Sequence, residues 1–191
     1  MSSHHIIRDE QEPPVLVFQL NDNWPQLSEI LGWSPNLLIM PELKDIFELK
    51  QTKIDGYLIE ENREVNIGEK DLVYNNSQIL ESLLNWISKK KYTALNIFCD
   101  DNFMMELFQQ LKTLPTSIPF IFFTEKGKYI LKPNANFKKW YPENFQIEIV
   151  NDDIKIIENL KREQDGYRVD KAGFVCIEVK GNLVLIKEKS V

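Results

Sequence analysis

Acidic and amide side chains follow one predicted strand at the point where the strand ends. Glu60, Glu61 and Asn62 come directly after the predicted strand 54–59. In open parallel sheets, ligands bind outside the carboxyl ends of the strands, and carboxylate oxygens bind hard cations. These three residues at the carboxyl end of the strand, which we call the acidic exit, are therefore the first candidate for a functional site. A second interpretation stays open, because loops at strand ends are solvated and are often acidic without any function.

Residues that the chain lacks exclude several classes of site. Its histidines are His4 and His5, so no imidazole is available within the body of the fold for a catalytic triad or a histidine-rich zinc site. We interpret this pair as part of a terminal segment. The seven glycines are scattered singly, and neither G-x-x-x-x-G-K-[ST] nor G-x-G-x-x-G occurs. A conventional phosphate-binding loop is therefore absent.

Composition predicts an ordinary cytoplasmic protein. Of its 191 residues, 43% are apolar and 27% are charged, and there is no apolar run of membrane-spanning length. A formal net charge of −6 argues against a nucleic-acid partner, and the one dense basic cluster, 89–91, is interpreted as the solvated end of a helix. Cys99 and Cys176 lie in apolar strand-like runs, which favours buried free thiols over a disulfide.

The segment 36–62 predicts one strand–helix–strand unit that would position the acidic exit. The apolar run 37–40 is bounded by Pro35 and Pro41, and Pro41 suits the first position of a helix. A second strand is predicted at 54–59, parallel to the first. Further strands, alternating with helical stripes, are predicted at 15–20, 72–74, 95–99 and 119–124. This alternation predicts an α/β domain in three layers with a mostly parallel sheet.

Beyond Glu125 the pattern changes to short strand-like runs without helical stripes. These runs are 128–131, 145–150, 154–157, 174–179 and 183–187. Gly181 and Asn182, between the last two runs, predict a hairpin turn. We therefore expect a domain boundary near residues 125–134, followed by a small antiparallel β domain.

With this two-part plan, residues 41–63 resemble a motif of the thiamine pyrophosphokinase family, D-G-G-A-N-R-L-L-E-L-G-I-K-P-D-V-I-I-G-D-F-D-S, without a gap. Phe47, Lys53 and Asp55 align with family positions. Segment 41–43 stands in place of Asp-Gly-Gly, and segment 59–62 stands in place of Gly-Asp-Phe-Asp. The chain is thus similar to a divergent member in which the positions near metal and phosphate have changed.

The resemblance implies residues 1–127 as the catalytic-type α/β domain and residues 128–191 as a thiamine-binding-type β-sandwich. It further implies a homodimer. The family reaction transfers pyrophosphate from ATP to thiamine, and carboxylates hold the Mg²⁺ that this transfer needs. Glu60 would supply one carboxylate, and Asp100 or Asp101 would supply a second. Trp140 could stack on thiamine, or it could belong to the β-domain core or a dimer interface.

Three functions follow from these observations. The first is a thiamine pyrophosphokinase-like protein that uses thiamine, ATP and Mg²⁺, with activity weak or lost. The second is a non-catalytic binding or dimerising module that retains the fold. The third is an unrelated α/β regulator that shares only the alternation of strands and helices with the family. Asp55 is expected at the amino end of its strand, away from the catalytic edge, in a local capping or turn role.

Overall fold

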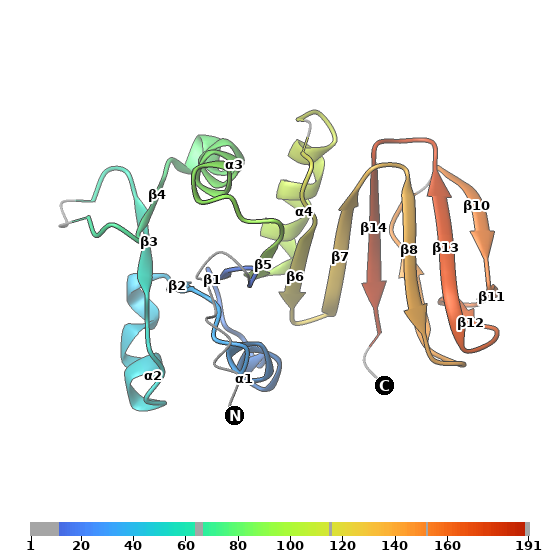
Figure 1. The fold of residues 1–191 in the computed structure, drawn as a ribbon, viewed down its shortest axis with the longest axis horizontal. Coiled ribbons are helices and arrows are strands. Elements are labelled where there is room, and N and C mark those ends of the chain that lie inside the picture. The colour runs from blue at the N-terminus through green and yellow to red at the C-terminus, as the bar shows by residue number, and fades with distance from the viewer. Residues whose placement is uncertain (1–11, 64–66, 115, 152, 190–191) are drawn as a thin grey trace, which may run out of the picture. The chain divides into compact units, whose positions relative to one another are not determined.

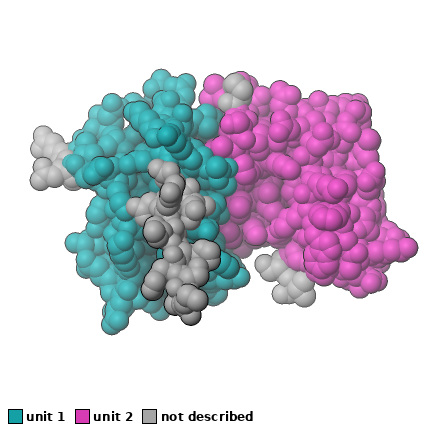
Figure 2. Space-filling model, viewed as in Figure 1, with its two compact units in different colours: residues 1–96 teal, residues 97–191 magenta. Residues whose placement is uncertain are grey.

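A computed structural model describes residues 12–63, 67–114, 116–151 and 153–189. His4 and His5 lie outside this range. The chain divides into two compact units, residues 1–96 and 97–191, which Figure 2 colours separately.

The first unit contains a parallel sheet (Figure 1). Its strands pair in chain order, and each pair is parallel: β1 (Val15–Val17), β2 (Leu37–Ile39), β3 (Gly56–Glu60) and β4 (Leu72–Tyr74). All residues of β1 and β2 are buried. Near-continuous apolar strands are typical of parallel sheets that are covered on both faces.

Helices follow β1, β2 and β4. They are α1 (Trp24–Leu31), the 3₁₀ turn η1 (Pro41–Leu43) with α2 (Lys44–Leu49), and the 3₁₀ turn η2 (Asn76–Gln78) with α3 (Ile79–Lys90). The stripe predicted for α3 is buried at Ile79, Leu80, Leu83 and Ile87. By contrast, α2 buries Phe47 but leaves Ile46 and Leu49 exposed. The short α2 therefore packs through a narrower face than its sequence predicts.

The second unit begins within β5 (Leu95–Phe98), which lies across the boundary between the two units. It continues with α4 (Asp101–Leu111), β6 (Phe120–Thr124) and β7 (Gly127–Pro133). β6 and β7 form an antiparallel hairpin in which Thr124 pairs with Gly127. Gly127 has a φ of +135°, a backbone conformation that side chains other than glycine rarely adopt.

Two antiparallel sheets complete this unit. A small sheet has the order β10 (Ile154–Glu158), β13 (Gly173–Val179), β8 (Asn136–Tyr141). The other continues from β7 through β14 (Leu183–Glu188), β9 (Gln146–Ile149) and β12 (Gly166–Val169) to β11 (Leu160–Glu163). Buried side chains from both sheets share one core that includes Phe137, Val175, Ile147 and Ile186. The predicted fold class, a mostly parallel α/β part followed by an antiparallel β-sandwich, is confirmed.

The predicted hairpin at Gly181 and Asn182 is wrong. β13 pairs with β8 and β10, whereas β14 pairs with β7 and β9, so the connection between β13 and β14 passes from one sheet to the other. Asp153 fixes this connection, because its carboxylate accepts a hydrogen bond from the Gly181 N–H at 2.6 Å and its carbonyl accepts one from the Lys180 N–H at 2.9 Å. A turn sequence between two strands does not fix which strands pair.

Both cysteines are free thiols. Cys99 is buried, and burial raises the pKa of its thiol, with the charges of Asp100 and Asp101 adding to the effect. Cys176 is half-buried in β13. Within the described residues, no helix is both long enough and apolar enough to cross a membrane.

Candidate functional site

The predicted acidic exit lies at the carboxyl end of β3. Glu60 is the last residue of the strand, and its Oε1 accepts a hydrogen bond from the Asn76 amide. Oε2 of the neighbouring Glu61 accepts one from the Asn75 amide at 3.0 Å. Asn75 also caps η2 through its Oδ1, which accepts from the Ser77 N–H at 3.0 Å. The cap residue Asn75 and the first residue of η2, Asn76, therefore also bind the two glutamates.

The segment that aligns with the family's Asp-Gly-Gly holds an ion pair. Glu42 lies 2.5 Å from the guanidinium of Arg63, and both side chains are exposed. A backbone hydrogen bond and the hydrogen bond from Arg63 together hold the pKa of Glu42 below its usual value. This carboxylate is thus engaged within the protein.

The other predicted carboxylates belong to the second unit. Asp100 caps α4, since its Oδ1 accepts from the Phe103 N–H at 2.7 Å. Oδ1 of Asp101 accepts from the Thr124 hydroxyl at 3.1 Å and from the Tyr129 hydroxyl at 3.3 Å. Burial, followed by the charge of Asp101, raises the pKa of Tyr129. Asp101 thereby links the start of α4 to the β6–β7 hairpin.

The carboxylates that were predicted to bind Mg²⁺ are each engaged by other protein groups. Among the described residues, no group of three or more His, Cys, Asp or Glu side chains is placed to hold a metal. Glu60 belongs to the first unit, whereas Asp100 and Asp101 belong to the second, and each already accepts protein hydrogen bonds. Magnesium requires near-octahedral oxygen ligands with several waters. The metal-binding role of these residues stays a prediction.

Trp140 lies on the outer face of the small sheet. It pairs in register with Phe174 on the adjacent strand, and the two residues are 54% and 57% exposed. The next residue, Tyr141, points into the core and donates a hydrogen bond from its hydroxyl to Glu188 at 2.7 Å. Trp140 is therefore not a core residue. Its stacking on thiamine and its place in a dimer interface both stay predictions.

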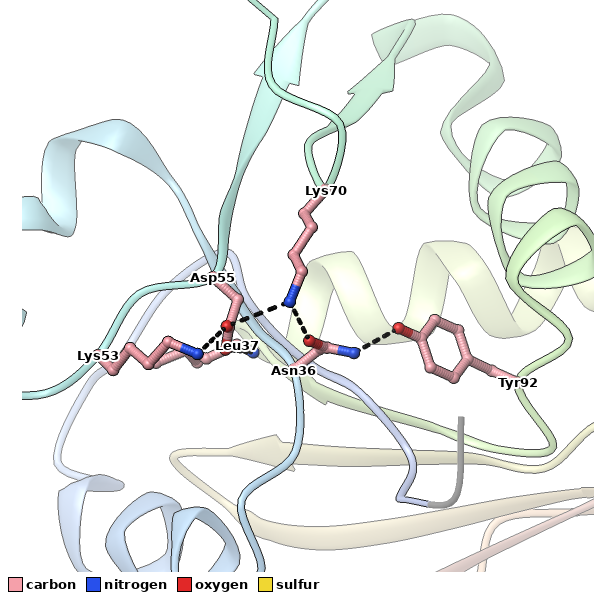
Figure 3. A network of polar contacts seen from close by, with 6 residues as sticks. All are labelled: Asn36, Leu37, Lys53, Asp55, Lys70 and Tyr92. Atoms are coloured by element: carbon pink, nitrogen blue, oxygen red, sulfur yellow. Dashed lines mark hydrogen bonds and ion pairs between the residues drawn. The ribbon is translucent and has the colours of Figure 1, made fainter. Parts of the chain in front are cut away.

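A polar network that sequence reasoning missed lies at the amino ends of the parallel strands (Figure 3). Asn36 precedes β2, and Lys70 lies just before β4. The Lys70 ammonium donates to Asn36 Oδ1 at 3.2 Å, and the Asn36 amide donates to the Tyr92 hydroxyl at 2.8 Å. The sequence does hold one indication of this network: each of these residues lies a few positions before an apolar strand, so all of them are expected at the same edge of the sheet.

Asp55 completes this network at the start of β3. Its Oδ2 accepts from the Leu37 N–H at 3.2 Å, while Oδ1 lies 2.7 Å from the Lys53 ammonium and 3.5 Å from that of Lys70. Burial alone would raise the pKa of Asp55, but the hydrogen bonds from Lys53 and Leu37 and the two lysine charges outweigh it and lower the pKa. Asp55 thus joins the beginnings of β2, β3 and β4.

The sequence matches no model of a known protein family. It also matches no curated protein.

Solved structures of thiamine pyrophosphokinases are similar in fold. The enzyme from Bacillus subtilis is 11% identical in sequence. The superposition covers 94% of this chain and 100% of that chain, with a TM-score of 0.65. The enzyme from Geobacillus thermodenitrificans is 7% identical, with coverages of 92% and 96% and a TM-score of 0.62. The enzyme from Candida albicans is 10% identical, with coverages of 95% and 90% and a TM-score of 0.52. At these identities the likeness shows that the chain has the thiamine pyrophosphokinase fold.

Proposed function

We propose that this chain is a thiamine pyrophosphokinase-like protein whose pyrophosphoryl transfer is weak or lost and which retains the fold as a binding or dimerising module. One observation carries the proposal: the predicted metal-binding carboxylates are engaged in internal contacts. Glu60 accepts from Asn76, Asp100 caps a helix, and Asp101 binds Thr124. Pyrophosphoryl transfer depends on a positioned metal ion and on cationic groups around the phosphates. Internally satisfied carboxylates favour a structural role at this edge.

The second candidate is an active thiamine pyrophosphokinase. It is favoured by the similarity in fold to such enzymes over 94% of this chain. In that case Glu60 with Asp100 or Asp101 would exchange their protein partners for Mg²⁺ bound to ATP, and Trp140 would stack on thiamine. Transfer would then take place in the cytoplasm, with residues 1–127 and 128–191 acting as the catalytic-type and thiamine-binding-type domains.

A product assay separates the two candidates. Purified protein at high concentration is incubated with thiamine, ATP and Mg²⁺, and thiamine diphosphate is measured by chromatography beside the Bacillus subtilis enzyme. We expect product formation at least about 1,000-fold slower than in that control, because removal of one electrostatic stabiliser alone costs about 100- to 1,000-fold in rate. A rate comparable to the control would contradict the proposal.

Calorimetry with MgATP provides a second test. The catalytic candidate predicts binding that disappears in Glu60→Ala, because this residue would ligate the metal. Our proposal predicts that Glu60→Ala and the wild type give the same result. Glu61→Ala, which removes a neighbouring carboxylate with a similar amide partner, is the matched control.

The module's partner is proposed to be a second copy of the chain. The outer face of the small sheet exposes Trp140, Phe174 and Ile156, and large exposed apolar side chains that share a sheet face are typical of interaction surfaces. Sedimentation equilibrium is expected to show a dimer for the wild type and a monomer for Trp140→Ser combined with Phe174→Ser. A monomeric wild type would contradict this assignment.

A further inference from the structure

A cavity of about 400 Å³ opens at the amino ends of the parallel strands in the first unit. It lies beside the polar network of Figure 3, because Asn36, Lys70 and Tyr92 line it. This edge is the opposite end of the strands from the acidic exit at Glu60. Cavities of a few hundred Å³ are of the size that holds small-molecule ligands.

Lysines dominate the charge of this cavity. Lys70, Lys89, Lys90 and Lys91 all contribute to the lining, and Glu69 is the carboxylate among the described residues that line it. Asp55 offsets part of the charge of Lys70, at 3.5 Å. Within the described part of the chain, Lys89, Lys90 and Lys91 have no carboxylate within ion-pair distance. A chain with a net charge of −6 therefore carries a local concentration of unpaired positive charge at one cavity.

The fold holds these lysines at the cavity for structural reasons. α3 ends at Lys90, and Lys91 adopts a left-handed conformation with a φ of 59°, which turns the chain so that Tyr92 is buried directly after the helix. On the other side, Asp71 accepts from the Tyr57 N–H at 2.7 Å and from the Gly68 N–H at 2.6 Å. This contact ties the loop that carries Lys70 to β3.

Aromatic side chains form another part of the cavity wall. Trp86 and Tyr92 pack with their ring centroids 5.1 Å apart, and both line the cavity. The Trp86 Nε1 is buried and has no hydrogen-bond acceptor among the described residues. The indole also provides a spectroscopic probe located at the cavity.

We propose that this cavity binds a small anion of the di- or triphosphate class. Each lysine ammonium acts as a point charge toward a phosphate oxygen. The cluster formed by Lys89, Lys90 and Lys91 therefore matches a ligand with several adjacent negative charges better than it matches a singly charged anion. Inorganic pyrophosphate and a nucleoside triphosphate share this chemistry, and the planar base of the latter would have the half-buried Trp86 available for stacking. The site does not depend on the acidic exit or on pyrophosphoryl transfer.

The experiment follows the indole N–H resonance of Trp86 in a ¹⁵N-labelled full-length chain. Trp86→Phe assigns this resonance among those of Trp24, Trp33 and Trp140. Pyrophosphate and ATP are titrated separately in the presence of EDTA, so that metal binding at the acidic exit does not contribute. Sulfate at equal ionic strength reports nonspecific screening.

The test variant is Lys89→Gln combined with Lys90→Gln. Both lysines are at the surface end of α3, so we expect the thermal midpoint to be unchanged. The matched control is Lys44→Gln combined with Lys50→Gln, which removes the same charge from the same unit at positions that do not line the cavity. Lys91 is kept, because it occupies the left-handed position that ends α3.

We expect pyrophosphate or ATP to move the Trp86 resonance saturably, with affinity at least about tenfold weaker in the test variant and within about twofold of wild type in the control. Tighter binding of ATP would assign the ligand as a nucleoside phosphate, whereas equal affinities would assign recognition to the phosphates alone. The proposal is overturned by an unmoved Trp86 resonance at millimolar anion, by equal weakening in both variants, or by an equal response to sulfate.

Discussion

The two ends of the same parallel strands differ in how their polar residues are used. At the carboxyl end, Glu60 and Glu61 are paired with asparagine amides that belong to the following helical turn. At the amino end, Asp55 and Lys70 form a network between the beginnings of three strands, beside a lysine-lined cavity. The fold associates ligand binding with the first end, whereas this chain concentrates unpaired charge at the second.

This difference distinguishes features that the fold determines, such as strand order, from features that the individual side chains determine. The strand order and the positions where the strands end follow from the architecture, so they do not depend on which side chains stand at those positions. Glu42, just after β2, carries a side chain, so this position does not permit the close backbone approach that a glycine permits. A similarity in fold therefore indicates the edge at which such folds bind ligands, but it does not show that this chain binds a ligand there.

The largest expected effect is loss of the amino-end network. Asp55→Ala should lower the free energy of unfolding by about 2–3 kcal/mol, because it leaves the Leu37 N–H without an acceptor and removes the carboxylate from Lys53 and Lys70. Urea unfolding followed by circular dichroism measures the change. Asp55→Asn, which retains an oxygen for Leu37, should lose about half as much. Equal losses in the two variants would show that the backbone hydrogen bond contributes little.

The same carboxylate predicts a dependence of stability on pH. The pKa of Asp55 is lowered in the folded state, so its contribution is fully present above the unfolded-state pKa of about 3.9 and is lost as pH falls through the lower folded-state value. The stability difference between wild type and Asp55→Asn should therefore be largest above about pH 5 and shrink below about pH 4. Thermal midpoints across this range test the prediction, and a constant difference would contradict it.

A smaller effect is expected at the start of α4. Asp100→Ala should cost about 1 kcal/mol, because it removes the acceptor for the Phe103 N–H, whereas Asp100→Asn should stay within about 0.5 kcal/mol of wild type because asparagine is an equally good cap. Chemical unfolding of both variants measures this. If Asp100→Asn proved as harmful as Asp100→Ala, the stabilisation would come from the negative charge at the amino end of α4 and not from the hydrogen bond alone.

The smallest effect is expected at the carboxyl end of β3. Glu60→Gln should change the free energy of unfolding by less than about 0.5 kcal/mol, because the residue is only half-buried and its partner is an exposed amide. Addition of Mg²⁺, or its removal with EDTA, should leave the thermal midpoint of both proteins unchanged. A midpoint raised by Mg²⁺ in wild type but not in Glu60→Gln would restore the metal prediction.

The sequence predicts the first unit well because its strands and helices have clear periodicity. The buried stripe of α3 and the apolar β1 and β2 follow directly from residue spacing. The second unit is harder. β8 was not predicted because Lys138 and Lys139 interrupt its apolar pattern, yet Lys139 bonds to the buried carboxylate of Glu188. β11 and β12 were also missed, since their residues are mostly polar and only partly buried.

Candidate site residues could be predicted by type but not by partner. The acidic residues do lie where strands end, but their neighbours come from other segments: Asn76 reaches Glu60 across 16 positions, and Thr124 reaches Asp101 across 23. The amino-end cavity was missed for the same reason. Lys89–Lys91 are typical of a solvated helix end when considered alone, and only the fold brings Lys70 and Tyr92 beside them.

The position of β14 has a consequence for how the protein is made. This strand pairs with β7 on one side and with β9 on the other, although both precede it in the chain by dozens of residues. Translation proceeds from the amino end, so β7 and β9 leave the ribosome before β14 is synthesised. The edges of β7 and β9 that later pair with β14 are unpaired during this interval. Exposed edges of this kind are templates for aggregation. Slow or stalled synthesis just before Leu183 should therefore yield more aggregated nascent chains than a pause of the same length within the first unit.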